Sequence, residues 1–446
     1  MILLLAGCAS HGKTVNQPLT KPVVSQFYTH QTISTLKGDR SNKIALILSF
    51  SGGGTRAAAL AYGVLEELRD TRVIINGKSR RLLDEVDVIS SVSGGSFTAA
   101  YYGLHGDGTF EDFEKVFLKY NFQTPLITSL LNPLNWFKSS ERTRRAVKLY
   151  ETNVFRNATF ADMEKRNGPV ILINASDLSY GVRFSFVQEY FNLLCSDLSS
   201  YPVANAVIAS SAVPILFNPI VVNNYHHCKK NTPKWLETSA LRFAGNADMS
   251  QVISRLESYY IDDNRKYVHF VDGGITDNLG LRAIYEYIEL SGGAKKLLDK
   301  TGNKGDLKHL AVIAVDASTA PERRMDVNKE LPSMEEVVDA VSDVQLHQYN
   351  AATLRLIQRS IKRWAQEMSI GDTPVMPHFI QLGLQNIKQA DLKKFINHIP
   401  TSFSLSSEQV DKLIAVGRSL LRNNPDYQKL LLRLKGTPIA QANRQK

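Results

Sequence analysis

Three short runs of apolar and small residues in this chain each end in a turn that contains glycine. The runs cover residues 44–50, 86–92 and 267–271, and their length suits a buried strand better than a helix. The turns that follow them read Ser51-Gly52-Gly53-Gly54-Thr55-Arg56, Ser93-Gly94-Gly95 and Asp272-Gly273-Gly274. Apolar residues at helical spacing follow the first two turns. This alternation predicts an α/β fold with a mainly parallel central sheet covered by helices on both faces.

The composition is that of a globular protein, and the length allows one large α/β domain with extensions or two modest domains. The chain has 446 residues, of which 43% are hydrophobic and 22% charged. We expect the α/β domain to occupy residues 41–320. Beyond it, Ser333 with Glu336 and Ser406 with Gln409 have the spacing of capping boxes at helix starts. Residues 321–446 are therefore predicted to form a mostly helical extension packed on the α/β domain.

Two stretches of the α/β domain are less regular. Residues 121–158 are expected to be a lid or a surface excursion. Residues 222–266 are rich in polar groups and are expected to be an insertion before the strand at 267. No apolar run approaches the ~18 residues that a membrane-spanning helix needs.

The start of the chain resembles a bacterial lipobox, the sequence at which a signal is cut before an acylated cysteine. Leu5-Ala6-Gly7-Cys8 carries the resemblance, which implies a lipoprotein signal over 1–8 with lipidation at Cys8. Residue 9 is Ala, which by analogy with bacterial sorting implies anchoring in the outer membrane of the cell envelope. The polar residues 9–40 are predicted to form a tether. The alternative is a plain apolar terminus.

The other two cysteines are Cys195 and Cys228. No CxxC pair is present, which disfavours a thiolate zinc site or a redox motif. They would pair in an oxidising compartment, but we expect two separate buried thiols.

The first glycine turn has the properties of an oxyanion-binding loop. Acyl transfer places negative charge on the attacked carbonyl oxygen, and that charge needs hydrogen-bond donors already aimed at it. The amides of Gly52, Gly53 and Gly54 lie between a strand and a helix start, where they can point at one anion. The positive charge of Arg56 would help to stabilise this negative charge, or Arg56 would only hold the loop in place. The alternatives are a plain turn and a phosphate loop, and the Gly-Lys-Ser/Thr of a phosphate loop is absent.

The other two turns supply a nucleophile and a base. Ser93 is centred in a pattern close to G-x-S-x-G, which holds a serine on a strained turn between strand and helix. The amide of Gly94 would join the oxyanion hole. Asp272 ends a strand beside Gly273 and Gly274, where its carboxylate could take the serine proton. The alternative for Asp272 is a side chain that only stabilises its own turn.

Taken in order, these motifs resemble the patatin-like phospholipase family. The resemblance covers residues 44–316 and rests on the G-G-G-x-R loop, the serine elbow and the D-G-G motif. Two longer segments also match, residues 210–217 (SSAVPILF) and 270–280 (FVDGGITDNLG). The resemblance implies a three-layer α/β/α fold, a Ser93–Asp272 dyad and hydrolysis of lipid carboxylic esters through an acyl-enzyme. The sequence contains no calcium loop or cofactor fingerprint, so we expect no cofactor and no metal.

The sequence leaves two rival functions open. One is an α/β-hydrolase with a Ser-His-Asp triad, whose histidine would come late in the chain, as His309, His378 and His398 do. The other is a non-catalytic envelope lipoprotein that uses the same scaffold for binding. The adjacent His226, His227 and Cys228 suggest a metal site only weakly, because neighbouring side chains point in different directions.

The charge of the chain favours an anionic surface. The formal net charge is +10 and the sequence pI is about 9.3. Basic residues concentrate near residues 138–148, beside aromatic side chains, and near residues 418–435. For a lipid hydrolase we expect lipid or phospholipid as substrate and an anionic membrane surface as partner. No nucleic-acid-binding module is recognised, and the sequence does not predict the oligomeric state.

Overall fold

The computed structural model describes the protein over residues 13–20, 40–122, 139–214, 216–229, 232–300, 306–319, 329, 331–371 and 373–438. Cys8 and most of the predicted tether therefore lie outside the described residues. A central sheet has the strand order β12-β11-β2-β5-β6-β10-β9, and β7 pairs with β6. Its strands are β2 (Ile44–Phe50), β5 (Val86–Val92), β6 (Val170–Asp177), β7 (Arg183–Ser185), β9 (Ile220–Asn223), β10 (Tyr267–Val271), β11 (His309–Asp316) and β12 (Met376–Gly383).

The sheet is parallel from β12 through β11, β2 and β5 to β6. At the other edge β10 runs antiparallel to β6, and β9 runs antiparallel to β10. Almost every position of β2, β6 and β11 is buried and most of these positions are aliphatic, as expected for strands covered on both faces.

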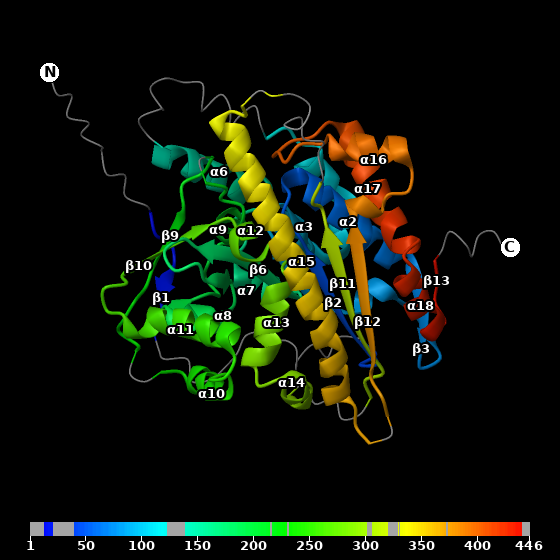
Figure 1. The fold of residues 1–446 in the computed structure, drawn as a ribbon, viewed down its shortest axis with the longest axis horizontal. Coiled ribbons are helices and arrows are strands. Elements are labelled where there is room, and N and C mark those ends of the chain that lie inside the picture. Colours follow the sequence, from blue (N-terminus) through cyan, green and yellow to red (C-terminus); the bar gives the residue numbers. More distant parts are fainter. Residues whose placement is uncertain are drawn as a thin grey trace.

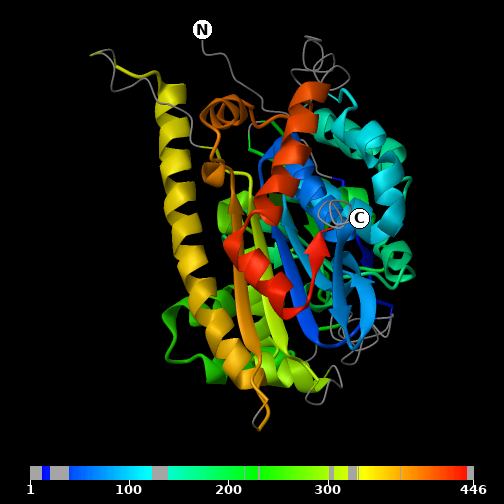
Figure 2. The same cartoon turned by 90° about the vertical axis from the view of Figure 1, so that its right-hand side faces the viewer.

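Helices cover both faces of this sheet (Figures 1 and 2). One face carries α2, α3, α9 and α17, and the other carries α13 and α15. The predicted three-layer arrangement is thereby confirmed. The helices are α2 (Gly54–Asp70), α3 (Gly94–His105), α4 (Thr109–Phe113), α6 (Ser139–Asn153), α7 (Phe160–Glu164), α8 (Gln188–Leu193), α9 (Val203–Ser210), α10 (Lys234–Arg242), α11 (Ala247–Ile261), α12 (Gly274–Asp277), α13 (Leu281–Leu290), α14 (Ala294–Lys300), α15 (Met334–Met368), α16 (Ala390–Asn397), α17 (Ser407–Arg422) and α18 (Pro425–Arg433).

Both predicted capping boxes are present, at Ser333 with Glu336 and at Ser406 with Gln409. Among the described residues, no helix is long and apolar enough to cross a membrane.

The stretch 121–158, expected to be irregular, contains the helix α6. The expected insertion 222–266 holds α10 and α11.

The amino-terminal stretch differs from the expected tether where it is described. Residues 13–20 lie against the body, and β1 (Gln17–Pro18) pairs with β8 (Ser196–Asp197). The buried Asn16 side chain donates to the Ser196 hydroxyl at 2.6 Å and accepts from the Asn223 amide at 2.9 Å. These bonds satisfy a buried amide on both sides and hold the segment in place.

The prediction of two separate thiols is wrong, because Cys195 and Cys228 form a disulfide bond. The two cysteines are 33 positions apart, but the segment after β9 runs back along the end of α8. The Tyr225 amide donates to the Leu194 carbonyl at 3.0 Å, which brings the two cysteines' Cα atoms to 5.7 Å. The spacing of the cysteines in the sequence could not show that the segment after β9 returns to the end of α8.

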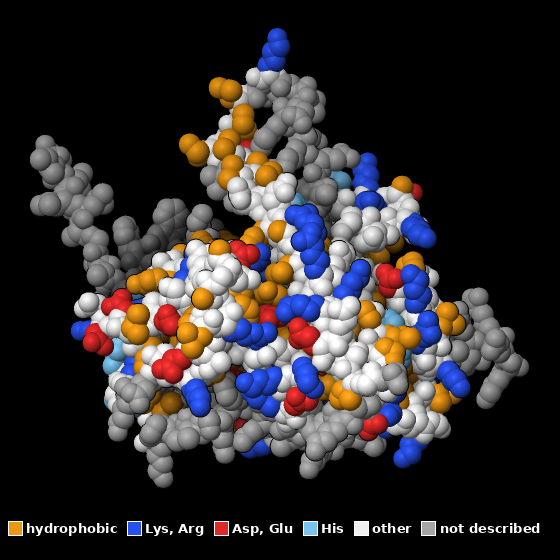
Figure 3. Space-filling view, turned by 60° about the horizontal axis from the view of Figure 1, so that its bottom comes forward, with side chains coloured by type: hydrophobic (Ala, Val, Ile, Leu, Met, Phe, Trp, Pro, Cys, Tyr) orange, Lys and Arg blue, Asp and Glu red, His pale blue; other side chains and the backbone are white. Residues whose placement is uncertain are grey.

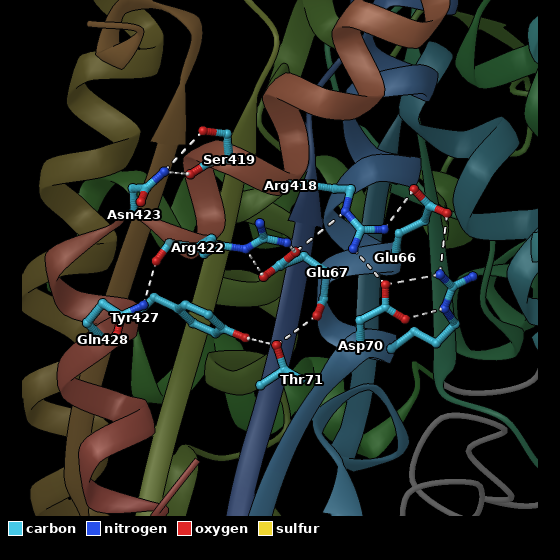
Figure 4. Close-up of polar contacts among 11 residues, drawn as sticks. Glu66, Glu67, Asp70, Thr71, Arg418, Ser419, Arg422, Asn423, Tyr427 and Gln428 are labelled. Atoms are coloured by element: carbon cyan, nitrogen blue, oxygen red, sulfur yellow. Dashed lines mark hydrogen bonds and ion pairs between the residues drawn. The ribbon is translucent and has the colours of Figure 1, made fainter. Parts of the chain in front are cut away.

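Helix α17 of the C-terminal extension packs closely across α2, since a Cβ atom added at Gly417 would lie 2.4 Å from the Leu60 carbonyl oxygen. An ion-pair network borders this crossing (Figure 4). Arg422 binds both carboxylate oxygens of the buried Glu67, at 2.8 and 2.6 Å. Arg418 binds Glu66 at 3.2 Å and Asp70 at 2.6 Å. A bidentate arginine–carboxylate pair that is shielded from solvent is stronger than an exposed pair. These two arginines therefore hold the extension to the α/β domain instead of forming a free basic surface.

The crossing itself depends on glycine at Gly63 of α2 and Gly417 of α17. A Cβ atom added at Gly63 would lie 2.2 Å from the Ile414 carbonyl oxygen. We expect Gly63→Ala to lower the free energy of unfolding by about 3 kcal/mol, because a backbone atom cannot move aside as a side chain can. Urea unfolding measures the change. Gly245→Ala is the matched control, since open space surrounds Gly245, and an equal loss in both variants would contradict the prediction.

Candidate active site

Ser93 lies at the sharp turn between β5 and α3, in a backbone conformation that is rare for a non-glycine residue. Its φ and ψ are 50° and −125°. Such a conformation costs free energy and persists only where the surroundings enforce it. The buried amide of Ser93 donates to the hydroxyl of Ser210 at 2.8 Å, which satisfies a group that the turn would leave without a partner. The elbow predicted from the sequence is therefore the turn that the chain adopts.

Asp272 reaches this elbow from the antiparallel strand β10. Val271 lies opposite Ser176 of β6, while Asn174 of β6 lies opposite Val92 of β5. Strand β10 thus begins beyond the carboxyl end of β6 and runs back along it. It ends at the same edge of the sheet as β5. The short length of β10 places Asp272 beside Ser93 although the two strands run in opposite directions and β6 lies between them.

The two side chains are in hydrogen-bond contact, with 2.8 Å between Ser93 Oγ and Asp272 Oδ2. The other carboxylate oxygen, Oδ1, accepts the Gly274 amide at 2.8 Å. Both side chains are buried. Burial raises the pKa of Asp272 to about 6, while the Gly274 and Ser93 hydrogen bonds pull the pKa in the opposite direction. A carboxylate with this pKa is ionised at neutral pH and is still a better proton acceptor than an exposed aspartate.

Three of the four predicted oxyanion amides face no acceptor among the described residues. They are the amides of Gly53, Gly54 and Gly94, which lie at the amino ends of α2 and α3. The Gly52 amide instead donates to the Asn278 carbonyl at 3.0 Å, so it is not free to bind an anion. Gly52 matters for its size, because a Cβ atom there would lie 2.7 Å from Asn278 Oδ1 and 3.4 Å from Ser93 Cβ.

Arg56 holds the glycine loop from outside the site. Its guanidinium donates to the carbonyls of Ala317 at 3.0 Å and Ile399 at 2.6 Å, and to the hydroxyl of Thr401 at 3.0 Å. Burial lowers the pKa of Arg56 to about 10, and the group stays charged at neutral pH. Of the two roles that the sequence left open, these contacts correspond to holding the loop.

Ser210, at the end of α9, connects the parts of the site. Its hydroxyl accepts the Ser93 amide, donates to the Asn174 carbonyl at 2.6 Å and lies 3.1 Å from the Ser96 hydroxyl. Its carbonyl accepts the Gly273 amide at 3.0 Å. Ser210 is not among the site residues predicted from the sequence. The signal was there, since Ser210 opens the segment 210–217 that carried part of the family resemblance.

Asn278 is a second residue of the site that is not among those predicted from the sequence. Its carbonyl holds Gly52, and its buried side-chain nitrogen has no hydrogen-bond partner among the described residues. A Cβ atom on Gly274 would lie 3.2 Å from its Oδ1, so the amide group lies between the glycine loop and the Asp272 turn. Asn278 also belongs to a segment that carried the resemblance, residues 270–280.

The histidines of the rival triad lie elsewhere. His309 and His378 are near the amino ends of β11 and β12, opposite the end at which Ser93 lies, and their ring nitrogens are 3.1 Å apart. The ring of His398 binds the Lys394 carbonyl of its own helix at 2.6 Å. No group of three potential metal ligands occurs in the described parts of the chain, and Cys228 is held in its disulfide.

The fold and the site together define a class of hydrolases, and a comparison with protein families gives the family. A model of the patatin-like phospholipase family matches residues 48–285, more than half of the chain. The chain belongs to the patatin-like phospholipase family and is a lipid acyl hydrolase by class. The family and fold class predicted from the sequence are confirmed.

Comparison with solved structures gives distant matches. Human GIVD cytosolic phospholipase A2 in complex with methyl gamma-linolenyl fluorophosphonate is 12% identical with a TM-score of 0.43, covering 96% of this chain and 70% of that chain. A second structure of human GIVD cytosolic phospholipase A2 is 11% identical with a TM-score of 0.38, covering 91% of this chain and 65% of that chain. VipD from Legionella pneumophila is 11% identical with a TM-score of 0.30, covering 85% and 67%. No curated protein sequence matches the chain.

Proposed function

We propose that this protein hydrolyses the carboxylic esters of lipids with Ser93 as nucleophile and Asp272 as general base. The observation that carries the proposal is the 2.8 Å hydrogen bond between Ser93 Oγ and Asp272 Oδ2. A serine hydroxyl is a weak nucleophile unless an adjacent base takes its proton, and Asp272 is the ionisable group in contact with it. Phospholipids and neutral lipids share this ester chemistry.

The reaction then proceeds in two steps. Ser93 Oγ attacks the ester carbonyl carbon while its proton passes to Asp272, and the protonated carboxyl gives that proton to the leaving alcohol oxygen. This leaves an acyl-enzyme on Ser93. In the second step Asp272 takes a proton from water, the hydroxide attacks the acyl carbon, and Ser93 recovers its proton as the fatty acid leaves.

The negative oxygen formed in each step would bind the amides of Gly53, Gly54 and Gly94. These amides belong to the amino ends of two helices, where the helix dipoles add positive potential. Donors fixed in place need no rearrangement as the charge develops.

A fluorophosphonate probe tests the assignment, because it forms a stable adduct only with an activated serine. We expect mass spectrometry of the labelled protein to place one adduct on the peptide that contains Ser93. Ser93→Ala should remain unlabelled, and Asp272→Asn should label at least about a hundredfold more slowly. A protein that binds lipid without catalysis would take no label, and this result would support the non-catalytic rival.

Replacing Ser210 by Ala should slow the reaction without changing substrate binding. The Ser93 amide would then be buried without its acceptor, so the elbow would lose part of its support. We expect kcat to fall about 10- to 100-fold with KM within twofold. Ser211→Ala is the matched control, because the Ser211 hydroxyl is also buried but has no partner among the described residues. Equal kinetics of the two variants would show that Ser210 has no positioning role.

We also propose that the protein is a lipoprotein of a bacterial envelope, lipidated at Cys8. The lipobox-like start motivates the proposal, and the disulfide supports a compartment more oxidising than the cytosol. Cells fed with labelled palmitate should incorporate label into the protein, and Cys8→Ser should abolish it. Equal incorporation in the two proteins would refute lipidation at Cys8.

A further inference from the structure

The amino-terminal end of α15 carries an exposed apolar stripe. Met334, Val337, Val341 and Val344 are spaced by three, four and three residues, which places them on one side of the helix. Their exposed fractions are 79%, 39%, 56% and 54%, and Leu331 just before the helix is 93% exposed. Figure 3 shows orange hydrophobic side chains gathered along the projecting part of the molecule at its top. A contiguous apolar surface of this kind marks an interaction site in a soluble domain.

The rest of the same helix is an ordinary part of the core. Ile357, Ile361 and Trp364 are buried against the sheet and α13. Fifteen residues separate Met334 from Tyr349, which at 1.5 Å per residue is about 22 Å of helix. The helix is therefore anchored by one half and presents the other half to its surroundings.

The stripe lies at the same end of the molecule as the candidate active site. Asn350 of α15 lies 3.5 Å from the hydroxyl of Ser318, two residues beyond the carboxyl end of β11. Helix α12, which follows Asp272 directly, packs against α15. Ile275 of α12 is itself an exposed apolar residue, so apolar surface occurs both on α15 and next to the site.

The charges around the stripe exclude a strongly anionic partner. The sequence has no lysine or arginine between Lys329 and Arg355, and five acidic residues fall in this interval. An anionic surface would be repelled by this end of the helix. The exposure is also greatest at the tip, at Leu331 and Met334, which suits insertion of the helix end better than lateral pairing along its length.

We propose that this end of α15, defined by Leu331, Met334, Val337, Val341 and Val344, docks the protein on a zwitterionic lipid surface. Docking there brings the carboxyl edge of the sheet, where Ser93 and Asp272 lie, next to the lipid. The choice of a lipid surface as partner rests on the proposed function. It also modifies the prediction of an anionic membrane surface, because the apolar stripe carries the contact and the charged side chains between Lys329 and Arg355 are all acidic.

Flotation with phosphatidylcholine vesicles tests the proposal. The full chain carries Cys8→Ser so that no lipid anchor contributes. Replacing Met334, Val341 and Val344 together by Gln should weaken vesicle binding at least about tenfold, because three aliphatic contacts are lost. The control replaces Leu241 and Ile261 by Gln, residues that are 84% and 68% exposed on α10 and α11 at the other end of the molecule (Figure 1). Its binding should stay within twofold.

Activity measurements separate docking from chemistry. The stripe variant should lose vesicle hydrolysis in parallel with binding and should hydrolyse a water-soluble short-chain ester within twofold of the unsubstituted protein. Equal flotation of the stripe variant and its parent would overturn the proposal. Sedimentation velocity gives a second test. If the parent is a dimer and the stripe variant is a monomer, a second copy of the chain covers the stripe, and the proposal is overturned. Flotation needs no turnover, so a protein that floats but hydrolyses nothing refutes the proposed function and leaves docking intact.

Discussion

Asp272→Asn is expected to lower kcat for a soluble ester by about 10³- to 10⁴-fold. The asparagine side chain fills the same space and can still accept the Gly274 amide, but it cannot accept the Ser93 proton. We therefore expect the variant to keep its structure and lose its activity. Far-ultraviolet circular dichroism measures the first, and stopped-assay kinetics measure the second. A variant with more than a tenth of the original activity would show that Asp272 is not the base.

The raised pKa of Asp272 gives this prediction a pH signature. The base must be ionised, and burial raises its pKa to about 6. We expect kcat/KM to be flat above about pH 7 and to fall tenfold per unit as the pH drops below 6. An inflection near pH 4 instead would mean that the catalytic carboxyl is solvated, and the buried Asp272 would then be excluded.

The same pKa predicts that Asp272→Asn is the more stable protein at high pH. The folded-state pKa of about 6 lies above the ordinary value of 3.8, so the folded protein binds this proton more tightly than the unfolded chain does. The stability contributed by proton binding is complete below pH 3.8 and is lost as the pH rises through 6. The neutral asparagine avoids this loss, which amounts to about 3 kcal/mol at pH 8.

The comparison must be made as a difference between the two proteins. Burial also raises the pKa values of Asp87 and Asp277 to about 6, so the stability of each protein changes over the same pH range for other reasons. The difference between the two free energies of unfolding cancels these shared contributions. It should be largest at pH 8 and should vanish as the pH falls below 3.8. A difference that does not depend on pH would contradict a buried, ionised Asp272.

The positions of Ser93 and the glycine loop were predictable from the sequence because they follow from local rules. Apolar runs of strand length end in glycine turns, and parallel strands bring their carboxyl ends to one edge of a sheet. Both β5 and β2 obey these rules, so Ser93 and Gly53 meet at the predicted edge. The capping boxes of α15 and α17 were likewise local signals that the structure confirms.

The remaining features depend on contacts between distant parts of the chain. Nothing local shows that β10 runs antiparallel to β6, and in a wholly parallel sheet Asp272 would reach the same edge by a different route. The Gly52 amide donates its hydrogen bond to the carbonyl of Asn278, which lies 226 positions later. The Arg422–Glu67 pair joins residues 355 positions apart, so the arginine looked like part of a free basic face. Local pattern therefore predicts each turn, and tertiary contact decides what the turn can bind.

Gly94→Ala is expected to lower kcat about a thousandfold, although no functional group is removed. A Cβ atom at Gly94 would lie 1.9 Å from the Gly54 carbonyl oxygen, so either the elbow or the glycine loop must move. Both carry the proposed oxyanion amides. A displacement of about 1 Å between Ser93 and these donors costs about a hundredfold, and each lost donor costs 10²- to 10³-fold.

The helical backbone at Gly94 accepts alanine, so the loss would come from the contact with Gly54 and not from backbone strain. Gly108→Ala is the control, because its added Cβ atom would meet only His105 Cβ at an ordinary 3.7 Å. Fluorophosphonate labelling of Gly94→Ala should slow in step with kcat, since the phosphonyl oxygen needs the same donors. If Gly94→Ala labels and turns over within tenfold of the unsubstituted protein, the amides of Gly53 and Gly54 do not form the oxyanion hole, and the donors must come from another part of the site.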